Sequence, residues 1–295
     1  MDRLVLSLFD GFQARLESGP SLVVSTKKAQ ALLAYLACSP TESHSRDKLA
    51  ALLWGESSQQ CARHSLRQTL YVLRATLNPL MPAILRGDSS GVSLDRSRLI
   101  VDALEFERLA QEDALEPLER AGALYKGDFL AGIGAGDQTF EEWLRDERDR
   151  LDTLAFDVYA KLLALQREAG LIAKAVRSAR CLLAIDPMQE VVHRVLMRLF
   201  MTQGRPEAAR RQYEMCARML RQEFGAEPQA ETKALLSEIT SRRFASKPRA
   251  GLMVDESFDS VHGRRKPGGR ISRNRRSVSC SGAAPNSRRS IRRQS

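Results

Sequence analysis

A 34-residue offset relates two stretches in the second half of the chain. Gly170 and Gly204 lie 34 positions apart, and the same offset pairs Ala175 with Ala209. It also pairs apolar positions, namely Val158 with Val192, Leu162 with Leu196 and Leu165 with Leu199. A repeat of this length is one helical pair, which buries its apolar face only by stacking on its neighbours. The spacing therefore predicts a stack of antiparallel helix pairs.

The residue types in these units resemble those of the tetratricopeptide repeat. The first unit has its aromatic, leucine, turn glycine, close-packing alanine and terminating proline at Tyr159, Leu162, Gly170, Ala175 and Pro187. The second unit keeps Phe200, Gly204, Ala209 and Tyr213 but has Arg221 in place of the proline. Its last helix is therefore expected to continue toward residues 224–225. Since two units are fewer than such arrays need, helices within residues 102–150 are expected to complete the stack.

The first hundred residues show a different pattern. Residues 3–24 mix alternating apolar positions with Asp-Gly and Ser-Gly-Pro turns, which favours short antiparallel strands. Helical spacing of alanines and leucines follows at 27–39 and 45–55. Ser25 or Thr26 can cap the first of these helices and Ser43 or Ser45 the second. A small sheet followed by helices is the expected order.

A third helix is expected at about residues 57–77. At 100° per residue, Leu66, Leu70, Leu73 and Leu77 fall within about 60° of one another, and Arg63, Arg67 and Arg74 fall within about 40° beside them. No acidic residue occurs between positions 57 and 77. Solvated helix faces usually mix charge signs. A DNA-facing edge is one interpretation, and an arginine-rich solvated face is the other.

Residues 83–94 carry a hairpin signal, because two short apolar runs flank Gly-Asp-Ser-Ser-Gly at 87–91. Strands, three helices and a hairpin occur in this order in a winged helix-turn-helix. In that architecture the third helix enters the major groove and the hairpin lies along the backbone or the minor groove. The surroundings of the third helix thus favour its interpretation as a DNA-reading helix.

The net charge of +10 is weak evidence for nucleic-acid binding because of its location. Residues 246–295 contain thirteen Lys or Arg and three Asp or Glu, so they account for the whole excess. Residues 1–101 carry a net +4 and residues 102–245 a net −4. The stretch from about 242 onward, rich in Arg, Ser, Gly and Pro, is expected to be disordered. It either adds nonspecific affinity for phosphate or is merely solvated.

No catalytic, cofactor or metal site can be picked out. The glycine-rich run GIGAGD at 132–137 has no following Gly-Lys-Ser/Thr and no clear preceding strand, so a loop between helices explains it better than a phosphate site. The five cysteines never form a C-x-x-C pair, and the four histidines are isolated. We therefore expect a protein that is not an enzyme and needs neither cofactor nor metal.

Targeting signals are also missing from the sequence. No apolar run approaches the roughly 20 residues of a membrane span, and the start MDRLVLSLFDGF has no basic region or small-residue cleavage site. The expected location is therefore the cytoplasm, with no membrane partner.

The combination of strands, three helices, a hairpin and helical repeats resembles regulators of the antibiotic regulatory protein (SARP) type. These proteins join an OmpR-like winged helix to a bacterial transcriptional activator domain. The matching stretches are TKKAQALLAYLA (26–37), SRDKLAALLW (45–54), ARHSLRQTLYVLRATL (62–77), VDALEFERL (101–109), LYKGDFLAG (124–132), FEEWLRDERDRL (140–151), IDPMQEVVHRVLMRLF (185–200) and GRPEAARRQYEMCARMLRQEFGAEP (204–228). They occur in order over about residues 3–240.

The resemblance implies a mainly α fold with a small β part. Its parts would be an OmpR-like winged-helix DNA-binding domain at 1–100, a helical-repeat bacterial transcriptional activator domain at 101–241 and a disordered basic tail at 242–295. The implied function is a transcriptional regulator, and more specifically an activator. Its implied partners are double-stranded DNA, RNA polymerase and a second copy of the chain on repeated sites.

Carried onto this sequence, the resemblance makes the helix at 57–77 the recognition helix. The expected DNA contacts on it are Arg63, His64, Arg67, Gln68 and Arg74. The expected phosphate ligands elsewhere are Lys27, Lys28, Arg46, Lys48 and Arg86. One departure from the family is the wing turn Asp-Ser-Ser-Gly, which has no Arg or Lys at its tip. This departure speaks against insertion of the wing into the minor groove.

Two other function classes stay open from the sequence. The first is a helical-repeat adaptor whose N-terminal domain binds protein rather than DNA. The second is an enzyme or a fragment of one. Salt-dependent binding to DNA would favour the regulator over the adaptor, and turnover of a nucleotide would favour the enzyme.

Overall fold

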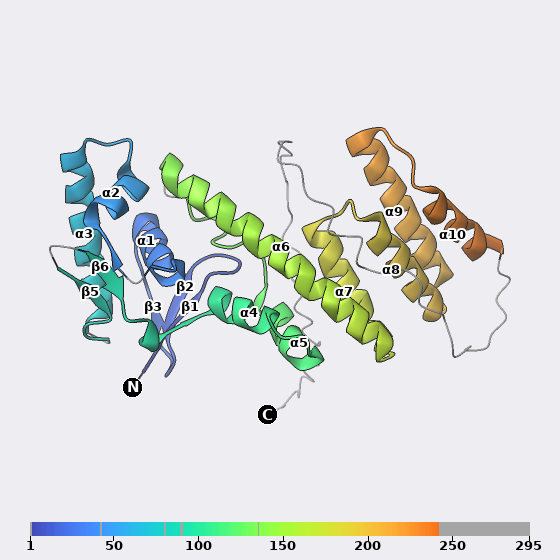
Figure 1. The fold of residues 1–295 in the computed structure, drawn as a ribbon, viewed down its shortest axis with the longest axis horizontal. Helices are drawn as coiled ribbons and strands as arrows, with labels where there is room; N and C mark the ends of the chain where they lie inside the picture. The colour runs from blue at the N-terminus through green and yellow to red at the C-terminus, as the bar shows by residue number, and fades with distance from the viewer. Residues whose placement is uncertain (1, 42, 80, 89–90, 135, 242–295) are drawn as a thin grey trace, which may run out of the picture.

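The computed structural model describes residues 2–41, 43–79, 81–88, 91–134 and 136–241. The chain is elongated, with the strands and the first three helices at one end and a succession of helices leading away from them (Figure 1). This is the expected mainly α fold with a small β part. The expectation of a disordered tail over 242–295 lies outside the described residues.

A four-stranded sheet holds the N-terminal segment. Its strands are β1 (Leu4–Ser7), β2 (Gln13–Leu16), β3 (Ser21–Leu22) and β7 (Leu99–Val101), in the order β3-β2-β1-β7. The antiparallel pairs β1–β2 and β2–β3 confirm the expected small sheet. The fourth strand, β7, pairs parallel to β1, with Leu4 opposite Leu99. This long-range pairing was not among the expectations from the sequence.

Three helices then build the helix-turn-helix: α1 (Lys27–Cys38), α2 (Arg46–Trp54) and α3 (Gln59–Leu77). Each begins at a hydroxyl side chain that accepts a hydrogen bond from a backbone N–H group three residues on. These N-caps are Thr26, Ser45 and Ser58. Two of the three were among the expected caps, because such residues satisfy otherwise unpaired N–H groups at helix starts.

The expected hairpin is present as β5 (Leu85–Gly87) and β6 (Val92–Leu94), which pair antiparallel. A short strand before α2, β4 (Ser43–His44), adds to β6 and completes a three-stranded sheet of order β4-β6-β5. A single 3₁₀ turn, η1 (Arg96–Arg98), leads into β7. The order of elements is that of a winged helix, as predicted.

Buried His44 is expected to make the stability of the winged helix depend on pH. The residue is 2% exposed, and its ring lies 5.2 Å from that of Tyr35. Burial lowers the pKa of His44 below its ordinary value of 6.5, and the nearby Lys48 lowers this pKa further. The unfolded chain therefore binds the proton more tightly than the folded chain. We expect the free energy of unfolding to fall as the pH drops below about 6.5.

Urea unfolding at pH 7 and pH 5 measures this effect. A His44→Phe variant should lose less stability between the two pH values than the parent chain. Buried His193 has a pKa lowered by the same cause, so part of the pH dependence should persist in the variant. If the variant and the parent lost equal stability, protonation of His44 would have no part in the pH dependence.

Seven helices follow in the described part of the chain. They are α4 (Asp102–Ala110), α5 (Leu115–Leu124), α6 (Gln138–Glu168), α7 (Ile172–Ile185), α8 (Glu190–Thr202), α9 (Pro206–Phe224) and α10 (Ala230–Ser241). Helix α4 packs on α5, α6 on α7 and α8 on α9, and α10 lies against α8 and α9. Glycines 170 and 204 have φ values of +69° and +68°, a left-handed conformation that suits glycine at a helix C-terminus. These features confirm the predicted helix pairs.

The winged helix and the helical repeats share one continuous core. The carboxylate of Asp102, at the start of α4, accepts hydrogen bonds from the backbone N–H groups of Leu8 and Phe9. Arg148 on α6 donates to the carbonyl oxygens of Phe129 and Leu130 at 2.7 and 2.8 Å. The first set of hydrogen bonds joins the end of β1 to the start of α4, and the second holds the segment between α5 and α6 against α6.

Candidate nucleic-acid interface

Helix α3 divides into a buried and an exposed face. Its buried residues are Ala62, Leu66, Leu70, Leu73 and Leu77, which pack toward α1 and α2. Over its 19 residues it carries no acidic side chain. The exposed side therefore has a positive potential that nothing on the helix itself cancels.

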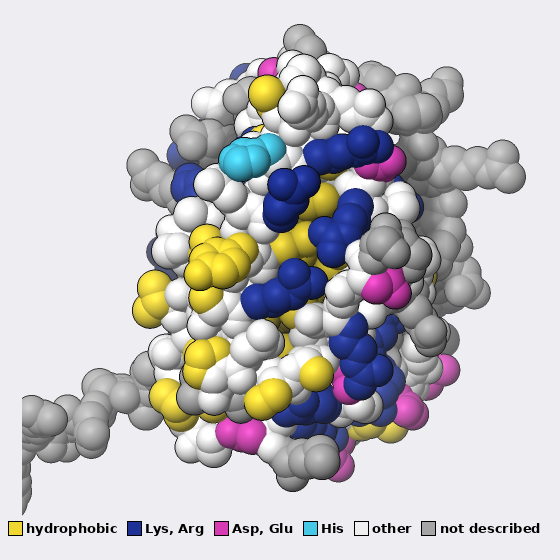
Figure 2. All heavy atoms as spheres, turned by 90° about the vertical axis from the view of Figure 1, so that its left-hand side faces the viewer, with side chains coloured by type: hydrophobic (Ala, Val, Ile, Leu, Met, Phe, Trp, Pro, Cys, Tyr) yellow, Lys and Arg dark blue, Asp and Glu magenta, His cyan; other side chains and the backbone are white. Residues whose placement is uncertain are grey.

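Positive charge gathers at this end of the molecule. Figure 2 views the end formed by α2, α3 and the wing, and shows Lys and Arg side chains in a column with apolar side chains visible between them. The cations of α2, α3, β5 and the following η1 are Arg46, Lys48, Arg63, Arg67, Arg74, Arg86, Arg96 and Arg98. They come from four elements of the fold rather than from one segment. We call this set of cations the basic face.

Arg63 is already engaged within the basic face. Its Nε and Nη2 atoms donate to the two carboxylate oxygens of Asp47 on α2, at 2.7 and 2.9 Å. The hydrogen bonds from Arg63 lower the pKa of the Asp47 carboxyl group. Both side chains are at least half exposed, and exposed ion pairs contribute little to stability. The guanidinium can therefore leave Asp47 for another anion at small cost.

Arg67, His64 and Gln68 are the exposed polar side chains at the centre of α3. Among the described residues, none of the three takes part in a hydrogen bond or ion pair. Arg74 is half-buried, and a Cβ atom added to Gly87 would lie 2.7 Å from its Nη2 atom. The guanidinium of Arg74 thus lies against strand β5, and Arg67 is presented to the outside.

Two further arginines have partners in the wing region, and one of them, Arg46, joins the wing to the start of α2. Arg46 donates through Nε to the carbonyl oxygen of Asp88 at 2.8 Å. Arg86 forms an ion pair with Asp95 at 2.8 Å while 63% of its side chain stays exposed. Lys48, one turn into α2, is exposed. These three expected phosphate ligands therefore flank α3 on the basic face.

The two lysines at the start of α1 have other contacts. Lys27 donates to the carbonyl oxygen of Gly132 at 3.0 Å, and Lys28 donates to that of Leu53 at 2.6 Å. The Lys28 ammonium also lies 4.9 Å from the centre of the Trp54 ring, and burial lowers its pKa. The structure does not bring these lysines to α3. Their role as phosphate ligands stays a prediction.

The structure also brings Arg96, Arg98 and Tyr71 to this end of the molecule, residues that were not among the DNA contacts expected from the sequence. Arg96 is exposed in η1, and Arg98 donates to the carbonyl oxygen of Pro82 at 2.9 Å. Tyr71 on α3 is 74% exposed. The spacing of Tyr71 four residues after Arg67 was the available signal, because residues i and i+4 are neighbours on a helix.

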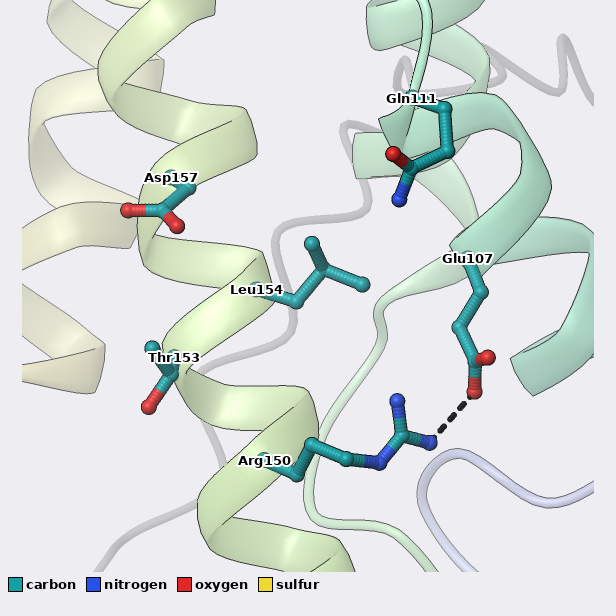
Figure 3. Close-up of a pocket in the computed structure, with 6 residues that line it drawn as sticks. All are labelled: Glu107, Gln111, Arg150, Thr153, Leu154 and Asp157. Atoms are coloured by element: carbon teal, nitrogen blue, oxygen red, sulfur yellow. Dashed lines mark hydrogen bonds and ion pairs between the residues drawn. The ribbon is translucent and has the colours of Figure 1, made fainter.

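The helical part has a hollow of about 270 Å³ on its surface, lined by Glu107, Gln111, Arg150, Thr153, Leu154 and Asp157. Figure 3 shows Glu107 and Gln111 projecting from one helix toward the other four residues on the neighbouring helix. Arg150 pairs with both Glu107 and Glu147, each at 2.6 Å, which raises the pKa of the guanidinium. Its charge is thus neutralised within the protein, so the hollow offers no free cation to an anionic ligand.

The described part of the chain also shows neither a cluster of metal ligands nor a membrane-spanning helix. No group of three or more His, Cys, Asp and Glu side chains there is arranged to hold a metal ion. None of the helices that the structure describes is long and apolar enough to cross a bilayer.

Comparison with known proteins agrees with this architecture. The family model of the bacterial transcriptional activator domain matches residues 101–240. The curated Regulatory protein AfsR of Streptomyces griseus is 25% identical over 233 residues, which are 75% of this chain and 23% of AfsR. The chain thus spans about a quarter of the length of that relative.

A solved structure of Mycobacterium tuberculosis EmbR in complex with a low-affinity phosphopeptide has a similar fold. The TM-score is 0.58 at 19% sequence identity, covering 81% of this chain and 65% of EmbR. The EmbR likeness concerns the fold. The activator-domain match at residues 101–240 and the similarity to AfsR support a SARP-like regulator.

Proposed function

We propose that this regulator binds promoter DNA directly, with α3 as the recognition helix in the major groove. The observation that carries the proposal is the face of α3 itself. One side of the helix is buried by leucines, and the other is exposed, free of acidic residues and edged by Arg63, Arg67 and Arg74. A helix in the major groove needs such a surface, because phosphates line the groove and base edges accept hydrogen bonds.

The contacts of each residue suggest a division of roles. Arg67, His64 and Gln68 have no partner among the described residues and are the candidates for base edges. Arg63 is held by Asp47 near the start of α3 and Arg74 lies against β5 near its end, so they are candidates for backbone phosphates toward the two ends of the helix. Arg46, Lys48 and Arg86 would hold phosphates beside them. Arg46 bonds a backbone carbonyl, and Arg63 and Arg86 each pair with an aspartate. Each of these cations can exchange its present partner for a phosphate.

The helical-repeat part has a second role in this proposal. Residues 101–241 would contact RNA polymerase or another copy of the chain on repeated sites, and the regulator would act as an activator in the nucleoid of a bacterial cell. The support is the match of this region to the activator-domain family, together with its connection to residues 1–100 through the hydrogen bonds from Leu8 and Phe9 to Asp102.

Selection of bound sequences from a pool of random duplexes tests DNA binding by the full chain. We expect recovery of a preferred sequence, and a logarithm of affinity that falls linearly with the logarithm of salt concentration. An excess of nonspecific duplex removes binding by residues 246–295, which carry thirteen basic side chains. Failure to enrich any sequence would contradict the proposal and favour a helical-repeat adaptor.

Arg67→Ala is expected to weaken binding to the selected duplex. If Arg67 reads a guanine, the loss should be about 1 to 3 kcal/mol and the preference at one base pair should relax. If it holds a phosphate, affinity should fall for all sequences and the salt slope should decrease by about one. Fluorescence anisotropy at several salt concentrations distinguishes the two results.

Arg218→Ala is the matched control, because Arg218 is an exposed arginine on α9, far along the chain from α3, and its loss changes the net charge equally. It should leave binding unchanged. If the binding isotherm of Arg67→Ala coincides with that of the parent chain, Arg67 does not contact DNA.

A further inference from the structure

Tyr71 is the large apolar side chain that α3 leaves in solvent among the described residues. It is 74% exposed, whereas the leucines of the same helix are buried. A tyrosine ring in water keeps a large apolar area hydrated, which burial against a partner would relieve. Tyr71 therefore has the properties of a residue that becomes covered when α3 binds.

Tyr71 lies beside the row of arginines on α3. At 100° per residue, Tyr71 lies about 130° from the centre of the leucine stripe, between Arg67 one turn before and Ala75 one turn after. On the same scale Arg63 and Arg74 lie about 20° apart, and Tyr71 lies about 60° to 80° from them, on the side away from the leucine stripe. Tyr71 therefore points outward beside the arginine row, at a level along the helix between Arg63, which bonds α2, and Arg74, which lies against β5.

We propose that Tyr71 is a specificity-determining residue whose ring packs on the C5-methyl group of a thymine in the major groove. The inference rests on the proposed function, since it concerns the same helix and the same groove. The thymine methyl group is the apolar feature that the four bases present in the major groove. Among the exposed side chains of α3, Tyr71 offers the largest apolar surface to it.

The same geometry constrains where that thymine lies. Residues 67 and 71 are one helical turn apart, or about 6 Å along the axis. Successive base pairs are about 3.4 Å apart. For a helix lying along the groove, the base contacted by Arg67 and the thymine contacted by Tyr71 should be about two base pairs apart.

Replacement of single thymines by deoxyuridine tests the inference, because it removes the methyl group and leaves every hydrogen-bonding group in place. The experiment uses the full chain and its selected duplex, with one thymine replaced at a time. At one position, the parent chain should lose affinity by roughly fourfold, the factor expected when one methyl group leaves an apolar contact. Tyr71→Ala should bind the two duplexes equally, and Tyr71→Phe should discriminate between them like the parent.

Phe224→Ala is the control, because Phe224 is an exposed aromatic residue at the end of α9. It should discriminate like the parent. Because Tyr71 is exposed, its variants should also keep the melting temperature of the parent, so that a change in binding is not a change in folding.

Three outcomes would overturn the inference. If uracil has no effect at any position and Tyr71→Phe loses as much affinity as Tyr71→Ala, then the hydroxyl group bonds a phosphate instead. If Tyr71→Ala binds like the parent, Tyr71 lies outside the DNA contact. If the parent chain shows no sequence preference, the proposed function itself fails. This result is distinguishable from the first two, because in that case no preferred duplex is selected.

Discussion

Replacing Phe106 by alanine is expected to lower the free energy of unfolding by about 3 to 5 kcal/mol. Phe106 lies on α4 and is fully buried. Its ring meets that of Phe9 edge-on, with centroids 5.5 Å apart, and lies 5.9 Å from that of Tyr125. Phe9 follows strand β1 and Tyr125 follows helix α5. The substitution would therefore open a cavity where the sheet meets the first pair of helices.

Urea or guanidinium unfolding followed by circular dichroism measures this loss. Phe224→Ala is the matched control, because that phenylalanine is 62% exposed and its removal should change stability by no more than about 0.5 kcal/mol. Equal effects of the two substitutions would mean that the aromatic cluster does not join the two parts of the chain.

Replacing Glu190 by alanine is expected to cost a similar amount, about 3 to 5 kcal/mol, for an electrostatic reason. Glu190 and Arg194 on α8 are both less than a tenth exposed, and their charged groups lie 3.7 Å apart. The Glu190 carboxylate also accepts hydrogen bonds from the backbone of Gln229 and the hydroxyl of Thr232. Its removal would leave the Arg194 charge buried without a counter-charge and would release the start of α10.

Two further variants distinguish this explanation from a loss of packing. Glu207→Ala removes an exposed partner of Arg210 on α9 and should change stability by no more than about 0.5 kcal/mol. The double variant Glu190→Ala with Arg194→Met should recover much of the loss, because it removes the unpaired charge as well. A double variant as unstable as Glu190→Ala alone would show that the charge is not the cause.

Several elements of the fold could be predicted because their causes are local. A hydroxyl side chain at a helix start satisfies backbone groups within three residues, and Thr26 and Ser45 do so as expected. The turns at Gly170 and Gly204 need a left-handed backbone, which glycine adopts readily. The order of strands, three helices and hairpin indicated the winged helix for the same reason.

The contacts that join distant segments could not be predicted in this way. The pairing of β7 with β1 and the hydrogen bonds from Leu8 to Asp102 connect residues more than 90 positions apart. Such contacts depend on how the helices pack, which short-range spacing does not encode. The approach of the Lys28 ammonium to the Trp54 ring likewise follows from the meeting of α1 and α2.

The candidate interface shows the same division. The sequence by itself determined that residues 57–77 would form a helix with a leucine face and an acid-free edge, because helical periodicity is a property of the chain alone. Only the tertiary structure decided that Arg63 is held by Asp47, that Arg74 lies against β5, and that Arg67 and Tyr71 project between them. Those differences arise from neighbouring elements, since a side chain's partners are set by what packs beside its helix.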